Sequence, residues 1–216
     1  MTREEVKACI EESGIFPGIR VNSADQALYA AKTIYDAGIP VAEITMTIPG
    51  AINVIEELAQ KYPDMVVGAG TVLDKETAER CLDAGARFLT STGLVPEVID
   101  SAHRRGVVVI PGALTPTEVI TAWKAGADYV KIYPAGALGG DLYIRSLKLP
   151  LPQVQLIAAG GVTQQTATGY ILAGATALGV GSELLPREAI RRHQEQRIHE
   201  LARRFLGFVK EARGTS

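Results

Sequence analysis

Short apolar runs alternate with longer segments of helical periodicity along nearly the whole chain. Continuous apolar runs of this length are typical of parallel strands buried on both faces, and the longer periodic segments are typical of amphipathic helices. The pattern predicts eight strands, each followed by a helix: Gly18–Val21, Val41–Met46, Met65–Gly68, Phe88–Ser91, Val107–Ile110, Tyr129–Tyr133, Val154–Ala158 and Ala177–Val180.

Two of the predicted helices begin with a recognisable signal. Ser23–Gln26 and Thr115–Glu118 both fit a capping box, in which the first and fourth side chains bond each other's backbone N–H groups. Pro116 would occupy the first helical position of the second helix, where a missing N–H costs nothing.

Eight consecutive strand–helix units predict an α/β protein that folds as a single (β/α)8 TIM barrel with an extra N-terminal helix. We expect one domain over 1–216, with the extra helix in 1–14, the barrel core in 15–186 and a C-terminal amphipathic helix in 187–216. A doubly wound open sheet is the alternative. It would require a glycine-rich phosphate turn after the first strand, and Arg20–Ser23 is not one.

The composition narrows the classes of partner. The 216 residues are 47% hydrophobic and 21% charged, with a net charge of −2, which favours neither nucleic acid nor an anionic membrane as partner. The charged N-terminal segment lacks a signal-peptide core, and no apolar run approaches the roughly 18 residues of a membrane span. We therefore expect a cytoplasmic protein, with Cys9 and Cys81 as reduced thiols in helices.

Lys131 is the most informative residue. Lysine is depleted in strands, and burial disfavours its charged form, so a lysine inside a barrel can act as a nucleophile that forms a Schiff base with a carbonyl carbon. Alternation along the strands places Lys131 and Glu43 on the faces opposite their apolar neighbours, which is the barrel interior. A buried structural ion pair is the alternative reading of these two residues.

Glycines at the ends of the last two strands predict an anion site. TIM barrels often bind phosphate with the loops after strands seven and eight, where backbone N–H groups face the ligand. The residues in these positions are Gly160, Gly161, Gly181 and Ser182.

Two further residues could bind a substrate carboxylate. The Thr71 hydroxyl follows a glycine-rich strand end, and Arg20 would offer a positive fork at the end of the first strand. His103, His193 and His199 show no metal-ligand spacing, so we expect no metal.

In combination, these residues resemble the 2-keto-3-deoxy-6-phosphogluconate (KDPG) and 4-hydroxy-2-oxoglutarate (KHG) aldolase family. The resemblance implies a Schiff-base aldolase without a metal or other cofactor, usually a homotrimer, with Lys131 as the imine lysine and Glu43 as the general acid/base. The matching segments are Glu43–Thr45, Gly68–Val72, Pro111–Gly112, Thr115–Glu118, Val130–Pro134, Gly160–Gly161 and Gly179–Ser182.

Three positions depart from the most common family pattern. Thr47 stands where many members carry an arginine. A subset with threonine there and a following Ile/Val-Pro, like Ile48-Pro49, carries an arginine on strand one instead, and Arg20 matches that position. Thr92 replaces a usual proline, and Ala159 replaces a threonine that is frequent in KDPG-specific members. An apolar residue at that last position resembles relatives that act on the 6-phosphogalactonate epimer.

The resemblance implies cleavage of a 2-keto-3-deoxy-6-phospho sugar acid, or of 4-hydroxy-2-oxoglutarate, to pyruvate and an aldehyde. Thr47, Thr71 and Arg20 would bind the carboxylate, although Arg20 could instead reach the phosphate. Thr92, Tyr133 and Ala159 would line the pocket. Two alternatives remain open: a catalytically silent phosphosugar-binding barrel, and another phosphosugar enzyme such as an epimerase or decarboxylase.

Overall fold

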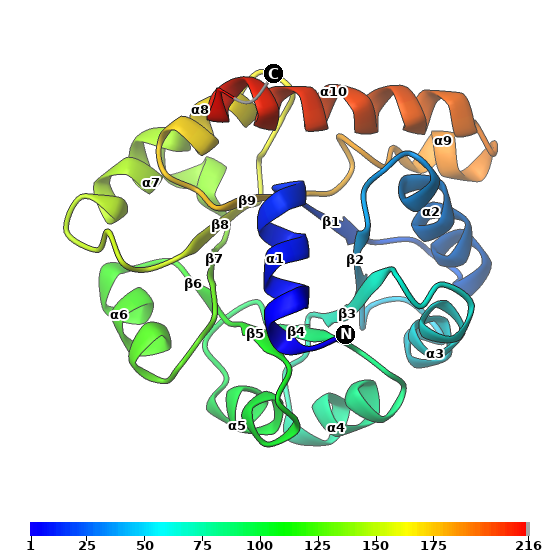
Figure 1. Cartoon of the computed structure of the whole chain (residues 1–216), viewed down its shortest axis with the longest axis horizontal. Helices are drawn as coiled ribbons and strands as arrows, with labels where there is room; N and C mark the ends of the chain where they lie inside the picture. The colour runs from blue at the N-terminus through cyan, green and yellow to red at the C-terminus, as the bar shows by residue number, and fades with distance from the viewer. Residues whose placement is uncertain (215–216) are drawn as a thin grey trace.

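The computed structural model describes residues 1–214 and contains one sheet of nine parallel strands that curls into a barrel (Figure 1). The strands, in chain order, are β1 Ile15–Ile19, β2 Val41–Thr45, β3 Val66–Gly70, β4 Phe88–Thr90, β5 Val108–Ile110, β6 Gly112–Ala113, β7 Val130–Ile132, β8 Leu156–Ala159 and β9 Ala177–Val180.

The barrel closes at Pro111. The strand order is β5-β4-β3-β2-β1-β9-β8-β7-β6, so the two ends of the sheet are β5 and β6, which only Pro111 separates along the chain. The Pro111 carbonyl accepts a hydrogen bond from the Lys131 N–H at 2.9 Å, so the interrupted strand still pairs with β7. Because β5 and β6 act as one strand, the predicted TIM-barrel fold with its extra N-terminal helix is confirmed.

Helices surround the barrel. They are α1 Arg3–Ser13, α2 Ala24–Asp36, α3 Ala51–Lys61, α4 Lys75–Asp83, α5 Pro96–Arg105, α6 Pro116–Lys124, α7 Asp141–Lys148, α8 Ala167–Leu172, α9 Arg187–Arg191 and α10 Glu195–Arg213, with a 3₁₀ turn η1 at Ala135–Leu138. The capping box predicted at Thr115–Glu118 is confirmed. At Ser23 only half of the box forms, because the Gln26 side chain accepts from the Asn22 N–H instead.

Most predicted strand boundaries lie one or two residues from those of the structure, and two differences are larger. The first strand begins at Ile15, three residues before the predicted start at Gly18, because the chain enters the sheet directly after the left-handed Gly14. The C-terminal segment forms two helices because His193 takes a φ of 50°, which breaks the helical path between α9 and α10. Positions 215 and 216, included in the predicted C-terminal helix, lie outside the described residues.

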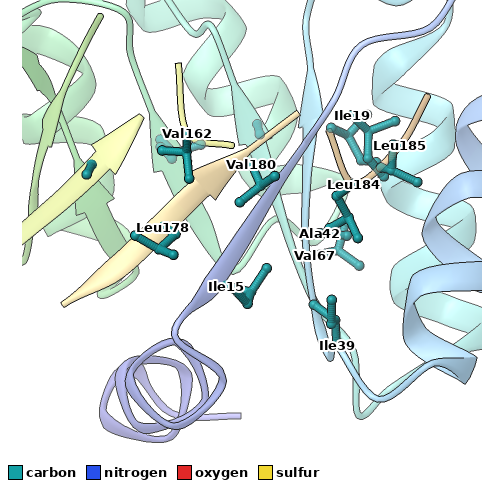
Figure 2. Packing of buried hydrophobic residues seen from close by; sticks show 14 of the residues in the cluster. Ile15, Ile19, Ile39, Ala42, Val67, Val162, Leu178, Val180, Leu184 and Leu185 are labelled. Atoms are coloured by element: carbon teal, nitrogen blue, oxygen red, sulfur yellow. The ribbon is translucent and has the colours of Figure 1, made fainter. Parts of the chain in front are cut away.

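Two separate apolar clusters hold the fold together. The larger one lies between the strands and the surrounding helices, and Figure 2 shows the part around Ile15, Leu178 and Val180. The smaller one fills the barrel interior, where the Phe16 and Phe88 rings meet with centroids 4.8 Å apart although β1 and β4 are not neighbours.

In residues 1–214 no helix combines the length and apolar composition needed to cross a membrane.

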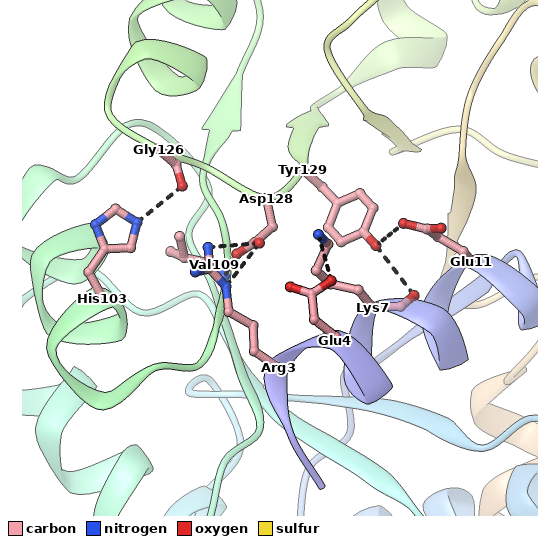
Figure 3. Close-up of polar contacts among 9 residues, drawn as sticks. All are labelled: Arg3, Glu4, Lys7, Glu11, His103, Val109, Gly126, Asp128 and Tyr129. Atoms are coloured by element: carbon pink, nitrogen blue, oxygen red, sulfur yellow. Dashed lines mark hydrogen bonds and ion pairs between the residues drawn. The ribbon is translucent and has the colours of Figure 1, made fainter.

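Helix α1 closes one end of the barrel (Figure 1). Its Val6 and Ile10 side chains join the interior cluster, and Arg3 pairs with the buried Asp128 just before β7 (Figure 3). Tyr129, the next residue, donates its hydroxyl to Glu11 of α1 at 2.6 Å. Because α1 blocks the end where the strands begin, the opposite end is the open mouth.

Candidate active site

A buried ion pair crosses the mouth of the barrel above the interior apolar cluster. Glu43 on β2 and Lys131 on β7 are 2% and 4% exposed, and the Lys131 Nζ lies 3.1 Å from Glu43 Oε1. The strands that carry them are not neighbours, so the two side chains meet only because the sheet closes. The predicted inward orientation of both residues is thus what the structure has.

Glycines on both neighbouring strands give the Glu43 carboxylate its space. A Cβ atom placed on Gly70 of β3 would lie 2.5 Å from Glu43 Oε1, and one on Gly18 of β1 would lie 2.9 Å from Oε2. Both distances are shorter than a van der Waals contact. The carboxylate therefore occupies volume that any other residue at these two positions would fill.

The surroundings keep Glu43 ionised. Burial raises the pKa of this carboxyl group, but the nearby Lys131 ammonium, the Thr90 hydroxyl and the Arg20 guanidinium lower it further, so that the pKa lies below its ordinary value of 4.5. At neutral pH the group is a carboxylate. A carboxylate in this position can accept a proton from a bound substrate.

A cavity of about 300 Å³ opens above the ion pair at the C-terminal ends of the strands. Gly160 and Gly161 form part of its wall with φ values of 79° and 90°, a backbone conformation that side chains other than glycine rarely adopt. Its walls include nine of the twelve predicted site residues: Arg20, Glu43, Lys131, Tyr133, Ala159, Gly160, Gly161, Gly181 and Ser182.

Arg20 stands between this cavity and a second hollow. Its side chain lines both, and the second hollow adds Arg187 of α9. A Cβ on Gly181 would lie 3.4 Å from Arg20 Nη1, so the guanidinium reaches the glycine-rich end of β9. Arg20 acts on Glu43 through its charge, but within residues 1–214 neither arginine forms a salt bridge with a carboxylate, so both guanidinium groups can bind an anionic ligand.

The other three predicted residues lie at the ends of neighbouring strands, outside the cavity walls. Thr47 is exposed, and its hydroxyl lies 2.9 Å from the hydroxyl of Thr45. Thr71 is half-buried directly after β3 with a φ of 59°, a strained conformation for a β-branched residue. Thr92 is exposed after β4, and its backbone carbonyl packs against Gly112.

Sequence reasoning missed several residues of the site. Thr90 donates its hydroxyl to Glu43 Oε1, and Phe16, Gly18 and Thr163 line the cavity. The signal for Thr90 was present, because it shares a strand face with the inward Phe88. In residues 1–214 no three histidine, cysteine or acidic residues gather as a metal-binding group, and His103 instead pairs with the Gly126 carbonyl (Figure 3).

Comparison with known proteins agrees with this geometry. The family model described as KDPG and KHG aldolase matches residues 6–201, which includes every strand of the barrel. The chain belongs to the KDPG and KHG aldolase family. This membership confirms the resemblance predicted from the sequence, and aldolases of this family are carbon–carbon lyases.

Relatives in the family cover nearly the whole chain. A 2-dehydro-3-deoxy-6-phosphogalactonate aldolase of Escherichia coli strain K12 is 34% identical over 197 residues, which cover 90% of this chain and 92% of that protein. The KHG/KDPG aldolase of the same strain is 30% identical over 196 residues, with coverages of 91% and 92%.

A solved aldolase structure of the family links this fold to imine chemistry. The KDPG aldolase of Legionella pneumophila, crystallised with pyruvate captured as a covalent carbinolamine intermediate, superposes with a TM-score of 0.80. It is 30% identical, and the match covers 90% of this chain and 95% of that chain. A carbinolamine is the adduct that precedes an imine, so that relative uses an amine nucleophile.

Proposed function

We propose that this protein is a class I aldolase in which Lys131 forms an imine with the C2 ketone of a 2-keto-4-hydroxy acid. The single observation that carries the proposal is the buried contact of 3.1 Å between Lys131 Nζ and Glu43 Oε1 at the floor of an open cavity. Such a pair supplies a nucleophile and a proton acceptor side by side, away from bulk water.

The reaction proceeds in balanced steps. The Lys131 ammonium first gives a proton to Glu43 and then adds to C2 as the amine. Glu43 returns that proton to the C2 oxygen, which leaves as water, and the product is a protonated imine that can accept an electron pair. Glu43, directly or through a water molecule, takes the proton of the C4 hydroxyl, and the C3–C4 bond breaks as its electrons move toward the imine. The aldehyde departs, the proton held on Glu43 moves to C3 of the enamine, and hydrolysis of the resulting imine releases pyruvate and Lys131.

The glycine-rich wall supports a phosphorylated substrate. Gly160, Gly161, Gly181 and Ser182 line the cavity directly after the paired strands β8 and β9, and Arg20 reaches Gly181. We therefore assign Arg20 to the phosphate end, and the carboxylate to the region of Thr71 and Thr47. The substrate class is a 2-keto-3-deoxy-6-phospho sugar acid, either the gluconate or its galactonate epimer, with 4-hydroxy-2-oxoglutarate as the unphosphorylated counterpart.

The proposal includes an oligomeric state and a cellular location. The resemblance to the family predicts a homotrimer, and the proposed location is the cytoplasm. The partners are then the small-molecule substrate and other copies of the chain. In the reaction as proposed, the lysine imine is itself the electron sink.

Trapping with borohydride tests the proposal. Wild-type protein incubated with pyruvate and reduced should gain the mass of one reduced pyruvate, and peptide mapping should locate it on Lys131. Lys131→Ala should lose both the adduct and turnover of the phosphorylated substrate. Lys124→Ala, which changes an exposed lysine of α6, should keep both.

Two outcomes would overturn the proposal. Turnover in Lys131→Ala at the wild-type rate would exclude the imine mechanism. Pyruvate that binds the wild-type protein, as measured by calorimetry, without leaving an adduct would favour a silent phosphosugar-binding barrel.

A further inference from the structure

The hydroxyl of Thr90 sits at the ion pair but has no part in the reaction described above. Thr90 is fully buried at the end of β4, one layer above Phe88 on the same inner face of the strand. Its Oγ1 donates a hydrogen bond to Glu43 Oε1. A valine side chain has the same shape as threonine and would fill the same volume in an apolar barrel. Packing alone therefore does not account for a hydroxyl group at this position.

The two oxygens of Glu43 have different surroundings. Oε1 accepts from both the Thr90 hydroxyl and Lys131 Nζ, and it lies over Gly70. Oε2 lies toward Gly18, and no hydrogen bond to it is present among residues 1–214. Gly18 and Arg20 line the cavity, and a Cβ on Gly18 would lie 3.3 Å from Arg20 Nη1, so Oε2 is the oxygen on the side where a substrate enters.

This division becomes important once Lys131 reacts. A lysine ammonium has three N–H donors, whereas a protonated imine has one. The direction of that remaining N–H is set by the position of the bound substrate. The hold of Lys131 on Oε1 therefore changes during the covalent steps. The Thr90 hydroxyl is not altered by the chemistry, and it remains on Oε1 throughout.

We propose that Thr90 is a positioning residue, which anchors Oε1 of Glu43 so that Oε2 faces the C4 hydroxyl while the substrate is bound to Lys131. The inference rests on the proposed aldolase function and adds a residue to it. If Thr90 were only a core residue with a satisfied hydroxyl, its replacement would change stability and leave the proton transfer as it is.

The test compares Thr90→Val, which keeps the shape and removes the donor, with Thr90→Ser, which keeps the donor. In Thr90→Val we expect kcat to fall about 10- to 100-fold with little change in KM, because a misplaced base slows proton transfer more than binding. Thr90→Ser should recover most of the loss. Thr33→Val, which changes a buried threonine of α2 that bonds the Tyr29 carbonyl, is the matched control and should keep the wild-type kcat.

The pH profile gives a readout that a structural role would not move. Burial raises the pKa of Glu43, and the Lys131 ammonium, the Thr90 hydroxyl and the Arg20 guanidinium lower it below its ordinary value. Removing the hydroxyl therefore raises this pKa, and the acid limb of kcat/KM should shift to higher pH in Thr90→Val but not in Thr90→Ser or Thr33→Val.

Borohydride trapping separates failure of this inference from failure of the proposed function. Thr90→Val should still form the pyruvate adduct, because the nucleophile is intact. Wild-type kcat and an unshifted acid limb in Thr90→Val would overturn the positioning role while the adduct upholds the aldolase. If Thr90→Val does not fold, Thr90→Ala removes the same donor, and the same two results decide the question.

Discussion

The Glu43 carboxylate depends on two glycines as much as on its charged partner. Gly18 and Gly70 flank it on either side, and Thr90 and Lys131 hold one of its oxygens. A carboxylate that is confined sterically and bonded on one oxygen loses little freedom when substrate binds. Preorganisation of this kind lowers the cost of reaching the transition state.

Gly70→Ala tests the steric part of this arrangement. The new methyl group would lie 2.5 Å from Glu43 Oε1, so the carboxylate must move away from Thr90 and Lys131. We expect kcat/KM to fall about 100-fold and stability to drop by about 1–3 kcal/mol from overpacking. A steady-state assay of pyruvate release and urea unfolding measure the two effects.

Gly207→Ala is the control, because Gly207 lies in α10 with open space around it. It should keep full activity and gain about 0.5–1 kcal/mol, as alanine is the better helix former. Wild-type kcat/KM in Gly70→Ala would show that a methyl group fits beside the Glu43 carboxylate without displacing it, which would contradict the structure.

For single residues, the alternation of apolar and polar positions along a strand was enough to predict that Glu43 and Lys131 face the barrel interior. It could not find the hydrogen bond from Thr90 to Glu43, because β2, β4 and β7 are not neighbours and their side chains meet only through closure and stagger of the barrel. Arg20 was predicted for its position at a strand end. Its reach toward Gly181 depends on the pairing of β1 with β9, the first and last strands of the chain.

Among the elements, α1 has the clearest separate role. It seals the barrel end away from the cavity, and Asp128 holds it there (Figure 3). Arg3 of α1 donates a hydrogen bond from Nε to Asp128 Oδ1 at 3.1 Å and adds an ion-pair contact from Nη2 at 2.8 Å, while the Val109 N–H of β5 donates to Asp128 Oδ2 at 2.9 Å. The Asp128 side chain is 4% exposed. A buried carboxylate with this many donors stabilises more than an exposed ion pair does.

Asp128→Ala should therefore lower the free energy of unfolding by about 2–3 kcal/mol, because it leaves Arg3 and the Val109 N–H without their partner. Activity at a permissive temperature should stay near wild type, since the cavity is at the other end of the barrel. Asp36→Ala, which breaks an exposed pair with Lys32, should cost at most about 0.5 kcal/mol. Equal losses in the two variants, measured by urea unfolding, would contradict the anchoring role of Asp128.

Boundaries of elements were harder to predict than their existence. The strand at Ile15 was placed too late because Pro17 and Gly18 weaken its β pattern, although all five of its residues are buried. The break at His193 has no proline or glycine to mark it. Its ring packs on Tyr29 of α2 with centroids 4.4 Å apart, so a tertiary contact accompanies a turn that local sequence does not indicate.

In the whole molecule, the two apolar clusters have different neighbours. The interior cluster lies under the polar site, whereas the larger cluster lies between strands and helices and includes Cys81 of α4. Cys81 is fully buried and contacts Met46 through sulfur at 3.5 Å. Burial raises its pKa to about 12, so the native thiol carries almost no thiolate at neutral pH.

Thiol labelling can therefore report opening of the larger cluster. In Cys9→Ala protein, which leaves Cys81 alone, labelling near pH 8 should be slow without denaturant and should accelerate with urea along the slope of global unfolding. The unfolded chain restores the ordinary thiol pKa of 9.0 and reacts at once. Cys81→Ala protein leaves the half-buried Cys9, which should react faster and with weak dependence on urea. Labelling of Cys81 that is independent of urea would mean that α4 detaches from the barrel on its own, and that the outer layer does not unfold as one unit with the site.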